Sequence, residues 1–217
     1  MRRRAFVGNT GALALGAAIL PSGLALAQAN APRAGTDFLV LNQPAPVETA
    51  SDKIEVIEFF GYYCPHCNAF EPVLSAWVKQ LPKDVVFRRV PVAFNGGAAP
   101  QQRLYYALES MGLVEQLHAR VFAAIHGERQ NLSQGAAIAD WVARQGVDRA
   151  KFTEQFDSFG VSTKAARARQ LQTAYQVEGV PALGVAGRYY TDGALARSME
   201  RVLQVADHLT DQVRRTR

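Results

Sequence analysis

The hydrophobic pattern of the chain begins with two β-type runs separated by a helical one. Residues 54–60 (IEVIEFF) and 85–92 are rich in β-favouring apolar side chains. From Pro65 to Leu81 the apolar residues recur every three or four positions, which predicts a helix with Pro72 inside it. A strand, a helix and a strand of these lengths predict a parallel pair of strands joined by a right-handed crossover.

A block of helices is predicted next, from about residue 100 to residue 176. Gly112 and Gly146 stand where two of these helices are expected to end. Asp148 and Ser162 are the candidate N-terminal caps of the last two helices. The tryptophan and phenylalanines of this block are expected in its core.

The end of the chain returns to the β-type pattern. Residues 183–185 and 189–191 are candidate strands separated by a turn at Gly187, and an amphipathic helix follows from about Met199 to Leu209. A further short strand is expected near Phe38–Leu41.

This order of elements predicts an α/β fold with a helical insertion. Strands from both ends of the chain would form one mixed sheet, with the helical block inserted between them. The expected sheet domain is discontinuous, over residues 28–97 and 177–217, and the expected inserted helical domain covers residues 98–176.

The first 27 residues have the three parts of an export signal. Arg2–Arg4 form a basic start, Ala5–Leu20 an apolar stretch, and Ala25–Ala27 supply small residues before a cut ahead of Gln28. Arg3 and Arg4 also resemble a twin-arginine motif, so the residues leave the export route open. Export leads to an oxidising compartment, where a pair of thiols can stay oxidised.

The charge of the chain gives no indication of nucleic-acid binding. Three of its 24 lysines and arginines belong to the export signal, and the remaining 21 are nearly balanced by 19 acidic residues. Three more arginines, Arg214, Arg215 and Arg217, end the chain and are expected in a frayed, solvated tail.

The chain has two cysteines, Cys64 and Cys67, at the predicted start of the first helix. A closely spaced pair in this place is typical of redox chemistry. The free N–H groups and the dipole at the helix N-terminus favour a thiolate at Cys64, and a protonated His66 adds to this effect. Cys67, one turn further on, is the natural resolving thiol.

A structural disulfide or a metal site would account for the two cysteines less well. A structural disulfide closing a loop of about four residues would contribute only about 2 kcal/mol in the loop-closure model. Two cysteines and one adjacent histidine are too few for a closed zinc site, so no metal is expected. The expected centre is the Cys64–Cys67 disulfide itself, without a further cofactor.

The residues around the cysteines resemble a known family. Residues 59–71 (FFGYYCPHCNAFE) resemble the active-site segment of the DsbA family of bacterial thiol:disulfide oxidoreductases. Gly179-Val180-Pro181-Ala182 resembles the cis-proline loop of that family, and Pro72 matches the proline in the active-site helix of thioredoxin-like proteins. The resemblance covers most of the chain after the signal. It implies a thioredoxin fold with an inserted α-helical domain.

The resemblance also implies roles for individual residues. Cys64 would be the nucleophile that carries the mixed disulfide, and Pro65 and His66 the dipeptide that tunes the redox potential. Pro181 would be the cis-proline facing the disulfide. The backbone of Val180 would pair with an extended substrate segment.

Glu58 is an acidic residue on the apolar face of the first predicted strand, below Cys67. Burial would raise its pKa and let it carry protons for Cys67, and the family has an acid at the matching position. A solvated glutamate at the strand end is the alternative. Pairing of Glu58 with Arg89 is a further, weaker hypothesis.

Several aromatic residues and histidines remain open. Tyr62, Tyr63, Phe94 and Tyr189 either line an apolar groove for unfolded polypeptides or pack in the core. The histidines on helical patterns are expected at the surface or half-buried, and not as ligands: His118, His126 and His208.

The resemblance implies a monomeric, periplasmic disulfide oxidase. It would transfer the Cys64–Cys67 disulfide to newly exported, unfolded proteins and be reoxidised by a DsbB-like quinone-linked partner in the inner membrane. A reductase would favour a dipeptide such as Gly-Pro between the cysteines, and a dimeric isomerase would need a dimerisation domain. A chaperone with bridged cysteines and a dedicated maturation factor also remain open. Substrate range, reduction potential and the true reoxidant are not set by the sequence.

Overall fold

The sheet joins strands from both ends of the chain. The computed structural model describes residues 31–217, and the predicted export signal at residues 1–27 lies outside them. The strand order is β1-β5-β4-β2-β3, in which β2 and β3 are parallel and the β1–β5, β2–β4 and β4–β5 pairs are antiparallel. The strands are β1 (Leu39–Val40), β2 (Ile54–Phe60), β3 (Val85–Pro91), β4 (Ala182–Val185) and β5 (Tyr189–Asp192).

The apolar run of β2 follows from its central place in the sheet. β2 pairs with β3 on one side and β4 on the other, and all seven of its residues are buried. Its two acids therefore need partners, because an unpaired buried charge is costly. Glu55 has Arg88 at 2.8 Å, and Glu58 belongs to the site described below.

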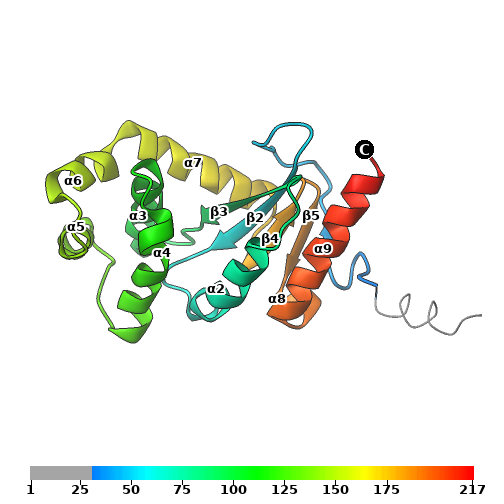
Figure 1. Cartoon of the computed structure of the whole chain (residues 1–217), viewed down its shortest axis with the longest axis horizontal. Helices are drawn as coiled ribbons and strands as arrows, with labels where there is room; N and C mark the ends of the chain where they lie inside the picture. The colour runs from blue at the N-terminus through cyan, green and yellow to red at the C-terminus, as the bar shows by residue number, and fades with distance from the viewer. Residues whose placement is uncertain (1–30) are drawn as a thin grey trace, which may run out of the picture. The chain divides into compact units, whose positions relative to one another are not determined.

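Helices cover the sheet on both faces. On one face, α2 (Pro65–Val78) and α9 (Met199–Arg215) lie side by side in Figure 1 and share an apolar core with β2 and β4. On the other face, Tyr175, which follows α7 (Phe159–Ala174), packs its ring 5.1 Å from that of Phe59. The predicted parallel pairing of β2 and β3, with α2 between them in the chain, is confirmed.

The predicted helical block is also present, between β3 and β4. Its α-helices besides α7 are α3 (Ala99–Ser110), α4 (Val114–Phe122), α5 (Gly135–Arg144) and α6 (Arg149–Asp157). Short helical turns are η1 (Gly96–Ala98), the π-helical η2 (Ala123–Gly127) and, after β5, α8 (Gly193–Ala196). Within residues 31–217, no helix combines the length and the apolar run that crossing a membrane requires.

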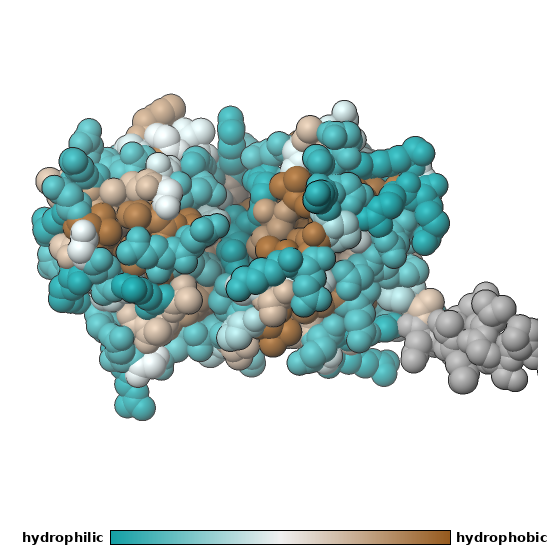
Figure 2. Space-filling model, in the orientation of Figure 1, coloured by the Kyte–Doolittle hydropathy of each residue, from teal (hydrophilic) through white to brown (hydrophobic). Residues whose placement is uncertain are grey.

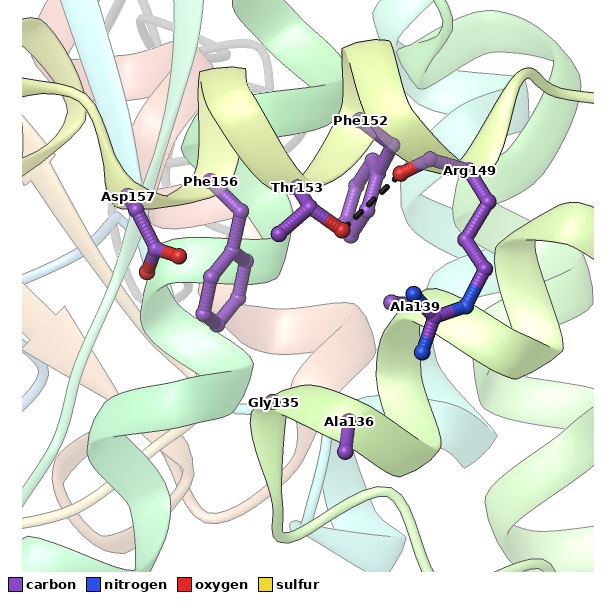
Figure 3. A pocket seen from close by; sticks show the side chains of 8 residues that line it. All are labelled: Gly135, Ala136, Ala139, Arg149, Phe152, Thr153, Phe156 and Asp157. Carbon is purple, nitrogen blue, oxygen red and sulfur yellow. Dashed lines mark hydrogen bonds between the residues drawn. The ribbon is translucent and has the colours of Figure 1, made fainter.

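Between α5 and α6 lies an apolar cavity of about 260 Å³. Apolar surface is visible over this end of the helical block in Figure 2. Figure 3 shows the rings of Phe152 and Phe156 pointing into the cavity from α6, above Gly135 and Ala136 of α5. None of the residues that line the cavity belongs to the cysteine site.

Three predictions about helix ends can be compared with the structure. Asp148 caps α6, as predicted, by accepting from Lys151 N at 2.9 Å. The first helix ends at Val78, before the predicted Leu81, which directly precedes Pro82 and is therefore disfavoured in a helix. Ser162 is not a cap: α7 begins earlier.

Ser158 takes the place predicted for Ser162. Its backbone is extended and its hydroxyl accepts from Val161 N at 3.2 Å, which is the geometry of an N-terminal cap. The Ser162 hydroxyl instead accepts from Arg103 Nη1 at 2.9 Å, so it ties α7 to α3.

Two predictions, one about the phenylalanines of the helical block and one about the terminal arginines, were partly wrong. Trp141, Phe152 and Phe156 are buried as predicted, but Phe159 is 87% exposed, because it is the first residue of α7 at the corner with α6. Arg214, Arg215 and Arg217 are exposed to solvent, as predicted, but Arg214 and Arg215 lie in a helix and not in a frayed tail. α9 extends to Arg215, where basic side chains suit the helix C-terminus, and Arg214 lies 2.7 Å from Asp84.

Candidate active site

Cys64 lies where the sequence predicted, at the N-terminal cap of α2. Its backbone is extended (φ −86°, ψ 117°), and its Sγ accepts from Cys67 N at 3.4 Å. Both cysteines are free thiols. Cys64 exposes 7% of its surface and Cys67 1%, so an incoming thiol reaches Cys64 first.

The two thiols are held in opposite protonation states. The hydrogen bond from the Cys67 thiol, the N–H groups of Cys67 and His66, and the His66 charge outweigh burial and lower the pKa of Cys64 to about 6. The same bond to Cys64, together with burial, raises the pKa of Cys67 far above its usual value. Near neutral pH the reduced site therefore holds a thiolate at Cys64 and a thiol at Cys67.

The cis-proline loop lies against Cys64. The Val180–Pro181 peptide bond is cis, as the resemblance implied, and Val180 O is 3.3 Å from Cys64 Sγ. A groove of about 280 Å³ adjoins this contact. It is lined by His66, the loop residues Gly179, Val180 and Pro181, and Asp192, Gly193, Ser198 and Met199.

The four aromatic residues left open by the sequence divide into two pairs. Tyr62 and Tyr189 are buried, so they do not line a groove, whereas Tyr63 is half-buried and Phe94 is 43% exposed. The ring of Tyr63 folds over Gly61, where a β-carbon would lie 2.5 Å from a ring atom. The glycine before the two tyrosines is therefore required by packing.

Glu58 is buried, so the alternative of a solvated strand-end acid was wrong. Burial raises its pKa to about 8; the positive charge of Arg89 opposes this shift and the negative charge of Glu71 adds to it. Glu58 Oε2 lies 3.2 Å from Arg89 Nε, which confirms the predicted pairing. The Glu58 charge also helps to raise the pKa of Cys67.

Glu71 and His118 also belong to the site, and the sequence analysis did not predict either of them as a site residue. Glu71 is buried on α2 and lies within 3.2 Å of His118, and Arg89 Nη2 donates to it at 2.7 Å. Glu71 stands four residues after Cys67, hence on the same helical face, and this spacing could have indicated it. His118 is buried, contrary to prediction, among residues of distant elements that no local pattern reveals.

A second histidine of the helical block also reaches the cysteine loop. His126, in the π-helical turn η2, donates from Nε2 to the Tyr62 carbonyl oxygen at 2.8 Å. His118 Nδ1 lies 2.8 Å from the Tyr62 hydroxyl. The helical block thus holds Tyr62, two residues before Cys64, at two points. Residues 31–217 contain no group of three or more His, Cys, Asp and Glu placed to hold a metal ion.

Comparison with known proteins gives a consistent family. A DSBA-like thioredoxin domain matches residues 55–207. The thiol:disulfide interchange protein DsbA of Bordetella parapertussis is 45% identical over 202 residues, which are 93% of this chain and 96% of the relative. The protein of the same name from Pseudomonas aeruginosa is 41% identical over 188 residues, 87% and 89% of the two chains.

Solved structures agree with these relatives. The crystal structure of Pseudomonas aeruginosa DsbA superposes with a TM-score of 0.82 at 40% identity, over 85% of this chain and 96% of that chain. The oxidoreductase DsbA from Xylella fastidiosa gives 0.79 at 33% identity, over 84% and 98%. The predicted thioredoxin fold with inserted helices is thereby confirmed. Because the domain match includes Glu58, both cysteines and the cis-proline loop, this chain belongs to the DsbA family of thiol:disulfide oxidoreductases.

Proposed function

We propose that this protein introduces disulfide bonds into other proteins by transferring its Cys64–Cys67 disulfide to them. The observation that carries the proposal is the asymmetry of the pair, with a stabilised thiolate at Cys64 and a buried, protonated thiol at Cys67. The similarity to thiol:disulfide interchange proteins over nearly the whole chain supports it.

Transfer needs two thiol–disulfide exchanges. A substrate thiolate attacks Cys64 Sγ, the Cys64–Cys67 bond breaks, and Cys67 leaves with the electron pair and takes a proton, for which Glu58 is the donor. A second substrate thiolate then attacks the substrate sulfur of the mixed disulfide, and Cys64 leaves as a thiolate. The substrate has lost two electrons to the enzyme, which ends as the dithiol.

The low pKa of Cys64 makes the disulfide a strong oxidant. A stable thiolate stabilises the reduced enzyme, and each roughly 30 mV of potential corresponds to about 1.4 kcal/mol. Pro65 and His66 act here as tuning residues: the His66 N–H and side chain both favour the Cys64 thiolate.

The groove beside Cys64 would receive the substrate. An extended segment of an unfolded protein would pair with the backbone at Val180, next to Pro181, and lie along the groove. β4 begins at Ala182, immediately after Pro181.

The cellular setting completes the proposal. The signal at residues 1–27 would direct a monomer to the periplasm, where its substrates are newly exported proteins. Residues 28–97 and 177–217 would form the thioredoxin-like domain and residues 98–176 the inserted one. A DsbB-like, quinone-linked membrane protein would reoxidise Cys64 and Cys67, and no further cofactor would be required.

The redox equilibrium with glutathione tests the proposal against a reductase. The Cys64–Cys67 state is followed by thiol trapping over a series of glutathione ratios. A potential well above that of glutathione is expected for a donor of disulfides. A potential near that of thioredoxin, about −270 mV, would assign the chain to the reductases.

The variant Cys64→Ser separates an oxidase from a binding module. Turnover of a reduced, unfolded substrate should stop completely, while binding of an unfolded polypeptide would persist in a chaperone. The change Ser51→Ala, at an exposed turn residue that is not among the residues lining the groove, is the matched control.

A further inference from the structure

One arginine stands between two buried carboxylates. Arg89 Nη2 donates to Glu71 Oε1 at 2.7 Å, and Arg89 Nε lies 3.2 Å from Glu58 Oε2. Arg89 Nε and Glu58 Oε2 both lack a hydrogen-bond partner among residues 31–217. The contact between them is therefore a charge pair and not an aligned hydrogen bond. One positive charge cannot balance two buried negative ones, so one carboxyl group keeps a proton.

His118 contacts only one of the two acids. It reaches in from α4, with Nε2 3.2 Å from Glu71 Oε2 and Nδ1 2.8 Å from the Tyr62 hydroxyl. Burial keeps Tyr62 protonated and His118 neutral. Since a carboxylate can only accept, the ring hydrogen is on Nε2 and the Tyr62 hydroxyl donates to Nδ1.

The hydrogen bonds around Glu71 and Glu58 are therefore unequal. Glu71 accepts from His118, from Arg89 and from the Ser75 hydroxyl at 2.5 Å. Burial acts to raise the pKa of Glu71, but these donors outweigh it and hold that pKa below its usual value. Among residues 31–217, Glu58 has only the misaligned contact with Arg89, so burial prevails there.

We propose that His118 is a positioning residue for disulfide exchange: its hydrogen bond fixes the negative charge on Glu71 and thereby leaves the proton on Glu58, beside Cys67. The inference rests on the proposed function, in which Glu58 supplies a proton to the departing Cys67 thiolate. It gives the inserted helical block a direct part in the chemistry of the cysteine pair.

The other titratable groups around the two acids do not compete for this proton. Tyr62 and, on α3, Tyr105 stay protonated because burial raises their pKa values. Cys64 and Cys67 also face Glu58, and neither titrates once they are joined in the disulfide. The groups that face Glu58 and Glu71 are thus Arg89 from β3, His118 from α4, Tyr105 from α3, Tyr62 from the loop, and the two cysteines.

The test is the pH profile of the first exchange step. The complete mature protein, in its oxidised form, is mixed with excess glutathione in a rapid-quench experiment. The rate of the first exchange is divided by the concentration of glutathione thiolate at each pH. This rate should fall as pH rises through the titration of Glu58. Glu58→Gln should remove this falling limb of the pH profile. In His118→Phe, Glu71 takes the proton, so the limb should move to lower pH by roughly one unit.

Two further variants separate positioning from packing. His118→Gln retains an N–H donor for Glu71 and should return the limb most of the way to its original pH. His126→Phe is the matched control, because it removes another histidine of the same block that bonds to Tyr62 but does not bond to Glu71. Its limb should stay in place even if the variant is less stable.

Two results decide between the inference and the function on which it rests. An unmoved limb in His118→Phe, with the limb absent in Glu58→Gln, would overturn the inference and leave the role of Glu58 intact. A limb that survives Glu58→Gln would remove the proposed role of Glu58 itself. Should His118→Phe not fold, ¹⁵N chemical shifts of wild-type His118 decide: a neutral ring protonated at Nε2 is expected near pH 7, and a ring protonated at Nδ1, or a charged ring, contradicts the inference.

Discussion

The position of a few protons decides what the two cysteines do. Cys64 and Cys67 have the same side chain, yet their pKa values are widely separated. The causes are the hydrogen bond from the Cys67 thiol to Cys64 and the places of the two residues, one at the N-terminal cap and one in the first turn of α2. Glu58 and Glu71 are separated in the same way by unequal hydrogen bonding around Arg89. Identical residues thus acquire different roles through their surroundings.

The thiolate titration of Cys64 is the first prediction at this scale. Ultraviolet absorbance of the reduced protein should show thiolate formation with a midpoint near pH 6. Cys67→Ala removes the largest stabilising contribution and should raise the midpoint most. His66→Leu removes a charge but keeps the backbone N–H, and should raise it by only about 0.5 unit. A larger shift in His66→Leu than in Cys67→Ala would contradict this order.

Glu58→Gln is predicted to change how stability depends on pH. The pKa of Glu58 is about 8 in the folded protein and near 4.5 when unfolded, so folding takes up a proton between these values. The wild type should therefore lose stability as pH rises from about 4.5 to 8, and Glu58→Gln should not. Urea unfolding of the two reduced proteins, the state to which this pKa belongs, measures the effect. The stability of Glu58→Gln relative to the wild type should be a few kcal/mol more favourable at pH 9 than at pH 5. An equal difference at both pH values would contradict the assignment.

At the scale of elements, the helices, strands and caps that have a local sequence pattern were predicted correctly. β2, α2 and the cap at Cys64 follow from an apolar run, a helical period and a proline at the first helical position. The exposed Phe159 and the cap at Ser158 were missed, because the boundary between α6 and α7 depends on how two helices meet. His118 was missed for the same reason: its partners come from α2 and from the loop after β2.

Packing against Tyr175 requires a glycine at position 184 of β4, and no sequence motif indicates this. A β-carbon at this position would lie 2.3 Å from a ring atom of Tyr175, whose hydroxyl accepts from Gly187 N at 3.0 Å. Gly184→Ala should therefore destabilise the protein by about 1–3 kcal/mol, because the ring has to shift. Denaturant unfolding measures this loss. Gly179→Ala is the control, since a β-carbon there meets nothing within 4 Å; equal losses in both variants would exclude the Tyr175 contact as the cause.

At the scale of the whole molecule, the helical block is part of the active site. Two of its histidines bond to Tyr62, and one of these also bonds to Glu71 on the active-site helix. These contacts connect α4 and η2 to the loop that carries Cys64 and to the active-site helix α2. The insertion therefore contributes hydrogen bonds to the redox site besides its bulk.

The stability of the reduced and oxidised proteins should diverge with pH. In the reduced protein the pKa of Cys64 falls from its ordinary value of 9.0 to about 6 on folding, so the thiolate stabilises the folded state. A lowered pKa contributes stability that is complete above the unfolded value and is lost as pH falls through the folded value. The oxidised protein lacks this titration. Urea unfolding measures the difference in the free energy of unfolding between the reduced and the oxidised protein. This difference should shift in favour of the reduced form from pH 6 to pH 9 and stay constant below pH 6.

Cys64→Ser supplies the control for that comparison, because it removes the titrating thiol while Cys67 remains. Its stability, measured against that of the oxidised wild type, should show no rise between pH 6 and pH 9. If the reduced wild type gained nothing over the oxidised form in this range, the Cys64 thiolate would not be stabilised by the fold. The oxidising power proposed here would then have no physical source, since the same free energy that stabilises the reduced form drives disulfide transfer to a substrate.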